Sequence, residues 1–101
     1  MPHLRELETG REIVLDDDSQ VLVGRGQDAD FRIEDRACSR KQFLLEMRAG
    51  ECFLTPVSPN SPTYCESILI CDRVRLDRDV EITCGQSRFT VSFPSPSQPA
   101  P

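Results

Sequence analysis

At residues 22–26 the sequence reads Leu-Val-Gly-Arg-Gly, and at residues 38–42 it reads Cys-Ser-Arg-Lys-Gln. Each stretch places an arginine next to a glycine or a serine, where one apolar run ends or another begins. If those runs are strands, the loops between them lie at one rim of a sheet, and Arg25, Ser39 and Arg40 converge there. Two guanidinium groups and a hydroxyl suit a phosphate, because charge-assisted hydrogen bonds fix geometry as well as supply energy. The two stretches therefore predict a site for a small anion.

Length and charge exclude several classes of protein. The chain has 101 residues and a net charge of −5, which fits one globular domain. A general nucleic-acid binder would present a basic surface, so we expect no direct contact with nucleic acid. No apolar run approaches the roughly 18 residues that cross a bilayer, so we expect no membrane span. The first residues, Met-Pro-His-Leu-Arg-Glu, lack the apolar core of a secretory signal.

The cysteines favour a reducing compartment. There are five of them, widely spaced, and most alternate with apolar neighbours, as small core residues do. No Cys-x-x-Cys pair occurs and His3 is the only histidine, so the sequence predicts neither a metal site nor a cofactor. We expect an intracellular protein, cytoplasmic or nuclear.

Short β-type runs follow one another along the chain, with turn residues between them. No window keeps the spacing of an amphipathic helix, so the pattern predicts an all-β sandwich or barrel of mostly antiparallel strands. Thr9-Gly10, Ala49-Gly50 and Gly85-Gln86 are the expected tight turns. The predicted strands cover residues 3–8, 11–15, 21–23, 31–33, 42–47, 52–55, 67–71, 73–76, 80–84 and 88–93.

The composition changes after Phe93 to Pro-Ser-Pro-Ser-Gln-Pro-Ala-Pro. Such a segment cannot pack into a core. We therefore expect a folded domain at residues 1–93 and a disordered tail at residues 94–101. The tail is either a frayed terminus or a linker to a further domain.

Several catalytic patterns are incomplete. Gly24-x-Gly26 lacks the third glycine of a dinucleotide loop, and no helix follows it. Ser39 as a nucleophile has only His3 as a possible base. The run Asp16-Asp17-Asp18 lacks the glycine and glutamate of a calcium loop. We expect a protein that is not an enzyme.

Three segments resemble the motifs of the forkhead-associated (FHA) domain family. The family pattern is a Gly-Arg at a strand end, a hydrophobic-x-Asp turn, and Ser-Arg-x-His opening the next strand. The corresponding segments here are Gly24-Arg25, Ile33-Glu34-Asp35 and Ser39-Arg40-Lys41-Gln42. The later Asn-Gly motif is only partly matched, by Asn60-Ser61-Pro62-Thr63. The resemblance covers about residues 3 to 93.

The resemblance implies a β-sandwich of about eleven mostly antiparallel strands that binds phosphothreonine peptides through loops at one end. It implies that Arg25 and Ser39 contact the phosphate, that Arg40 supports it, and that Asn60 or Ser61 holds the peptide backbone. Gln42 stands where the family has a structural histidine. The segment Asp35-Arg36-Ala37-Cys38-Ser39-Arg40, which follows a Gly-Arg-Gly, looks most similar to the branch attached to polynucleotide kinase-phosphatase and aprataxin. That branch also has glutamine at the position of Gln42, and it reads acidic phosphopeptides.

The function expected from these residues is phosphothreonine-dependent binding of a partner protein. Arg36, Arg40 and Lys41 cluster in the sequence beside the expected pocket, which favours acidic residues around the phosphothreonine. The alternative is an FHA-like scaffold that assembles proteins without phosphate, as in some secretion systems. The altered Asn-Gly motif favours that alternative.

Overall fold

The computed structural model describes residues 1–93, so the expectation for residues 94–101 falls outside the described part of the chain. The described residues form strands and turns without a helix, as expected for an all-β protein. No helix long and apolar enough to cross a membrane occurs among them. The strands are β1 (His3–Glu6), β2 (Glu12–Val14), β3 (Gln20–Gly24), β4 (Phe31–Arg32), β5 (Phe43–Arg48), β6 (Glu51–Pro56), β7 (Thr63–Cys65), β8 (Ile68–Ile70), β9 (Val74–Leu76), β10 (Val80–Cys84) and β11 (Ser87–Ser92).

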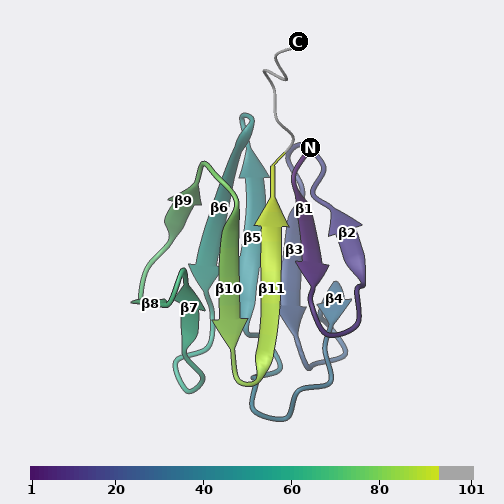
Figure 1. Ribbon diagram of the computed structural model, residues 1–101, viewed down its shortest axis with the longest axis vertical. Coiled ribbons are helices and arrows are strands. Elements are labelled where there is room, and N and C mark those ends of the chain that lie inside the picture. Colours follow the sequence, from purple (N-terminus) through teal and green to yellow (C-terminus); the bar gives the residue numbers. More distant parts are fainter. Residues whose placement is uncertain (94–101) are drawn as a thin grey trace.

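Two sheets pack face to face as a sandwich (Figure 1). One sheet has the strand order β2-β1-β11-β10-β7-β8, and the other has the order β4-β3-β5-β6-β9. Neighbouring strands run antiparallel except β3 and β4, which pair in parallel. The predicted sandwich of mostly antiparallel strands is confirmed.

The core lies between the sheets and comes from alternating residues of their inner faces. Val21 and Val23 of β3, for example, are buried, because successive side chains of a strand point to opposite faces. Phe89 of β11 crosses the gap and meets the ring of Phe43 edge to face, with a centroid distance of 5.5 Å. This aromatic contact joins the two sheets beneath the strand ends that carry the predicted site.

The structure corrects the sequence analysis at several points. It adds β7, which was missed because only three residues pair between Pro62 and the turn at Glu66-Ser67. The first strand ends at Glu6, whose carbonyl accepts the N–H of Gly10 at 2.8 Å and so closes a turn. Three of the five cysteines are buried, as expected for most of them, whereas Cys65 is half-buried and Cys71 is exposed.

The two ends of the described chain lie side by side. His3 of β1 pairs with Ser92 of β11, at the end of the sandwich opposite the β10–β11 turn (Figure 1). That turn, at Gly85-Gln86, contacts the loop that contains Asp35. The predicted site and the chain ends therefore occupy opposite ends of the molecule.

Candidate functional site

Backbone hydrogen bonds bring the two predicted arginine stretches together. The N–H of Arg25 donates to the carbonyl of Ser39 at 3.0 Å, and the N–H of Gly26 donates to the carbonyl of Arg40 at 3.0 Å. The N–H of Gln42 donates to the carbonyl of Val23 at 2.9 Å. These bonds extend the pairing of β3 with β5 beyond the strand ends. The convergence of Arg25, Ser39 and Arg40 follows from this pairing.

Gly24 makes this close approach possible. A Cβ atom at Gly24 would overlap the carbonyl oxygen of Arg40 and would lie 3.0 Å from the backbone nitrogen of Gln42. No side chain fits in that space unless the backbone shifts. The glycine is therefore required by the distance between two loops, and its φ angle is not the reason.

A hydroxyl pair lies beside Arg25. The Nε of Arg25 donates to the carbonyl of Cys38 at 3.1 Å, which folds the side chain back over the residue that precedes Ser39. The hydroxyl oxygens of Ser39 and Ser58 are 2.5 Å apart and share a hydrogen bond. The N–H groups of Asn60 and Ser61 each donate to the Ser58 oxygen at 3.2 Å. Ser58 was not predicted, because no motif marks it.

Gln42 connects three segments of the site through buried hydrogen bonds. Its side chain is fully buried, and its Oε1 accepts the N–H of Ser39 at 2.8 Å. Its Nε2 donates to the carbonyl of Ser61 and to the hydroxyl of Thr63, both at 3.0 Å. Its own carbonyl accepts the N–H of Val57 at 3.0 Å. Gln42, which stands where the sequence comparison placed a structural histidine, thus has a structural role through its side-chain amide.

Asn60 and Ser61 are placed differently. Ser61 is buried, and its hydroxyl donates to the carbonyl of Ala37 at 3.1 Å, so it ties the β6–β7 loop to the β4–β5 loop. Asn60 is exposed next to Ser58. Of the two, Asn60 is the one whose side chain is accessible to a ligand.

A basic pocket lies next to the hydroxyl pair. It has a volume of about 550 Å³ and is lined by Arg25, Gly26, Gln27, Asp28, Arg32, Arg40 and Lys41. Arg32 was missed in the sequence. Arg32 is the register partner of Gly24 in the parallel pairing of β3 with β4, and its Nε donates to the carbonyl of Arg25 at 3.3 Å. This pairing is what places Arg32 beside the predicted arginines.

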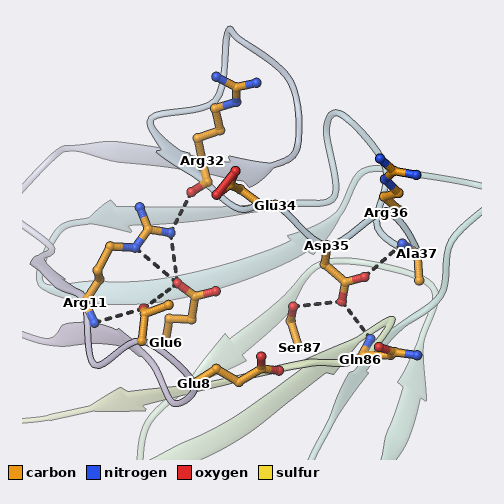
Figure 2. A pocket seen from close by; sticks show the side chains of 11 residues that line it. Glu6, Glu8, Arg11, Arg32, Glu34, Asp35, Arg36, Ala37, Gln86 and Ser87 are labelled. Atoms are coloured by element: carbon orange, nitrogen blue, oxygen red, sulfur yellow. Dashed lines mark hydrogen bonds and ion pairs between the residues drawn. The ribbon is translucent and has the colours of Figure 1, made fainter.

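Arg36 lies in a different place. It lines a second pocket of about 1170 Å³ that we call the mixed-charge pocket (Figure 2). There Arg11 donates to the carboxylate of Glu6 at 2.8 Å and to the carbonyl of Arg32 at 2.6 Å. Arg11 and Glu6 of the mixed-charge pocket thus already pair with each other. The sequence cluster of Arg36 with Arg40 and Lys41 is divided between two pockets.

Asp35 fixes the β4–β5 loop to the opposite sheet. Its carboxylate accepts the N–H of Ala37 at 2.8 Å, the N–H of Gln86 at 2.7 Å and the hydroxyl of Ser87 at 2.8 Å (Figure 2). Burial opposes ionisation, but these hydrogen bonds outweigh it and lower the pKa of the Asp35 carboxyl. Gly85 packs against this loop, since a Cβ atom there would lie 2.9 Å from the Asp35 carboxylate. The loop that carries Ser39 is therefore held on both sides.

The sequence model of the FHA domain family matches residues 21–85, which include Arg25, Asp35, Ser39, Arg40, Gln42 and Ser58. The chain belongs to the FHA domain family. No curated protein sequence is significantly similar to this FHA domain.

Solved structures show the same fold. The FHA domain of FhaA, in complex with the intracellular domain of Rv3910, is 24% identical over 90% of this chain and 99% of that one, with a TM-score of 0.81. The N-terminal FHA domain of Rad53p from S. cerevisiae, in complex with a phosphothreonine peptide, is 16% identical over 92% and 93%, with a TM-score of 0.78. The cytoplasmic domain of PscD, a type III secretion sorting-platform protein of P. aeruginosa, is 22% identical over 97% and 84%, with a TM-score of 0.77.

The site of this FHA domain offers hydroxyl groups and cations side by side on exposed loops. Arg25 and Ser39 are half-buried and Arg40 is exposed, so a ligand can reach all three. Such an arrangement can bind an anion with little rearrangement, because the loops are already fixed by Gln42 and Asp35.

Proposed function

We propose that this FHA domain binds a phosphothreonine-containing segment of a partner protein, with the phosphate held by Arg25, Ser39 and Arg40. The observation that carries the proposal is the pair of backbone hydrogen bonds from Arg25 and Gly26 to the carbonyls of Ser39 and Arg40. They hold two cations and a hydroxyl at one rim of the sandwich. Asn60 is the residue that we assign to the peptide backbone.

The expected affinity is moderate. Each charge-assisted hydrogen bond contributes about 1.5–3 kcal/mol. After the entropic cost of association is subtracted, a few such bonds are consistent with a binding free energy of about −8 kcal/mol, which corresponds to a dissociation constant in the micromolar range. This affinity suits reversible docking that a kinase switches on. No catalytic step is assigned to the chain, and its five free cysteines are consistent with a reducing, intracellular setting.

The proposal includes a preference for acidic residues around the phosphothreonine, since Arg40 and Lys41 face solvent at the basic pocket. It also includes kinship with the polynucleotide kinase-phosphatase and aprataxin branch. That kinship is supported only by the sequence pattern at residues 35–42 and by the structural role of Gln42.

A phosphate-independent scaffold is the second candidate. Two observations favour it: the likeness to the PscD domain, and the buried Ser61 at a position next to Asn60 where the family motif has Asn-Gly. In that case the loops would contact a folded partner, and the cations would pair with its carboxylates.

Titration calorimetry against a phosphothreonine peptide library, with unphosphorylated peptides as controls, distinguishes the two candidates. We expect binding of phosphorylated peptides only, and no binding when Asp or Glu replaces phosphothreonine, because a carboxylate carries less charge and fewer acceptor oxygens. Arg25→Ala should abolish binding while thermal unfolding stays close to that of the wild type. Arg88→Ala, at an exposed position on β11, is the matched control. Unchanged affinity in a folded Arg25→Ala variant would rule out this site.

A further inference from the structure

The basic pocket holds more positive charge than one phosphothreonine neutralises. Four cations line it, namely Arg25, Arg32, Arg40 and Lys41, with Asp28 as the single acidic residue. Their sum is +3, whereas the whole chain carries −5. A phosphate brings about −1.5 to −2 at neutral pH. A single phosphate therefore leaves positive charge unmatched in the pocket.

These cations also lack ion-pair partners within the described chain. None of the four forms an ion pair with any residue between 1 and 93. On other surfaces four arginines do pair with carboxylates, for example Arg11 with Glu6 at 2.8 Å and Arg75 with Glu51 at 2.8 Å. The basic pocket differs in that its unpaired cations lie together. Unpaired cations close together repel one another, and a bound anion relieves that repulsion. The pocket is suited to a strongly charged ligand.

The groups that bind the first phosphate lie at one side of this pocket. Ser39 and its partner Ser58 do not line it, whereas Arg25 and Arg40 do. A phosphothreonine held by Arg25, Ser39 and Arg40 is therefore bound at the edge of the pocket. Arg32 and Lys41 line the same pocket without an assigned anion.

Arg32 is positioned by the fold. Its Nε donates to the carbonyl of Arg25 at 3.3 Å, which leaves the terminal nitrogens of the guanidinium free for a ligand. Figure 2 shows this guanidinium directed away from the Arg11–Glu6 pair of the mixed-charge pocket. Arg32 and Lys41 together offer more N–H donors than the oxygens of one carboxylate accept, and a phosphate has the larger acceptor capacity.

We infer that the basic pocket is a second phosphate subsite, so that the preferred ligand carries a phosphoserine or phosphothreonine close to the first phosphothreonine. Arg32 and Lys41 bind the second phosphate, and Arg25 and Arg40 lie between the two. This inference rests on the proposed function, because it needs the first phosphate at Ser39.

The test compares three forms of a phosphothreonine peptide selected from the library. One form carries only the phosphothreonine, the second carries an added phosphoserine, and the third carries glutamate in place of that phosphoserine. The added residue is placed at each neighbouring position in turn. The proteins are the wild type, Arg32→Gln, Lys41→Ala and, as control, Arg36→Ala in the mixed-charge pocket. Thermal melts accompany every titration.

We expect the doubly phosphorylated peptide to bind about tenfold more tightly than the singly phosphorylated one at one or more positions. Glutamate should give a smaller gain. Arg32→Gln should lose the gain while keeping the affinity for the singly phosphorylated peptide, and Arg36→Ala should keep both. Lys41→Ala should lose the gain and should also weaken the singly phosphorylated peptide modestly where its flanking residues are acidic. Equal affinity for the singly and doubly phosphorylated peptides at every position would overturn the second subsite. So would a gain that glutamate reproduces, or one that persists in Arg32→Gln. Failure of the singly phosphorylated peptide to bind the wild type would instead overturn the proposed function.

Discussion

The Oε1 atom of Gln42 accepts the backbone N–H of Ser39 at 2.8 Å, from a side chain with no exposed surface. The same amide donates to the carbonyl of Ser61, so one side chain fixes the positions of the loop that carries Ser39 and the loop that carries Ser61. An uncharged amide satisfies a donor and an acceptor at once and does not titrate. The hydrogen bond from Gln42 that positions Ser39 should therefore not change with pH.

We predict that Gln42→Leu lowers the free energy of unfolding by about 2–4 kcal/mol, because it leaves the N–H of Ser39 and the carbonyl of Ser61 without a partner. Phosphopeptide affinity should fall as well, since both loops lose their support. Urea denaturation and calorimetry measure the two effects. Gln20→Leu, at an exposed position of β3, is the control and should change neither quantity by much. A stable Gln42→Leu variant with full affinity would contradict the structural role of Gln42.

Ser58→Ala should reduce phosphopeptide affinity about tenfold, or about 1.4 kcal/mol. The substitution removes the acceptor shared by the N–H groups of Asn60 and Ser61 and the partner of the Ser39 hydroxyl. The affinity is measured by calorimetry, with Ser92→Ala on the far end of β11 as control. If Ser58→Ala binds as the wild type does, Ser39 is positioned without its partner.

Asp35→Asn should destabilise the fold by about 1–2 kcal/mol at pH 7, because an amide cannot accept all three hydrogen bonds of the carboxylate. The pKa of Asp35 is lowered in the folded state, so the unfolded chain binds that proton more readily. The stabilisation is complete above the ordinary carboxyl range and is lost as the pH falls through the lowered pKa.

Urea denaturation of wild type and Asp35→Asn should therefore give a difference in unfolding free energy that narrows over the acid range below the ordinary carboxyl pKa of 3.8. Asp17→Asn, in the exposed acidic turn, provides the comparison. A difference that stays constant over this range would show that ionisation of Asp35 does not hold the loop.

Acidic residues around a single phosphothreonine should strengthen binding relative to basic residues, because Arg40 and Lys41 are exposed and unpaired within residues 1–93. The effect of each residue should be modest, about 0.2–1 kcal/mol, and should decrease as salt screens the exposed charges. Titrations at low and high salt measure it. A preference for basic residues at low salt would contradict the assignment of these cations.

The first two motifs could be predicted from the sequence because their spacing is local and their turn chemistry is specific. Gly24-Arg25 and Ser39-Arg40 each end or open an apolar run, and pairing of β3 with β5 brings them together. Ala49-Gly50 and Gly85 also behave as the sequence indicates, since all three have positive φ angles.

Ser58, Arg32 and Arg36 could not be placed from the sequence, because their positions depend on long-range pairing. Ser58 reaches Ser39 only because the chain after β6 folds back on Gln42. Arg32 reaches the basic pocket through a parallel contact of two residues, and Arg36 is turned away by the hydrogen bonds of Asp35. Periodicity carries no information about any of these contacts.

The pairing of His3 with Ser92 has a practical consequence for labelling, immobilising or fusing the domain. The start of β1 and the end of β11 lie at the end of the sandwich opposite the loop between β4 and β5, which carries Ser39 (Figure 1). A fluorescent label, a sensor surface or a neighbouring polypeptide joined at either end leaves the ligand-facing loops pointing outwards. Immobilised protein should therefore titrate like protein in solution, and a tethered copy would present its captured partner away from the tether.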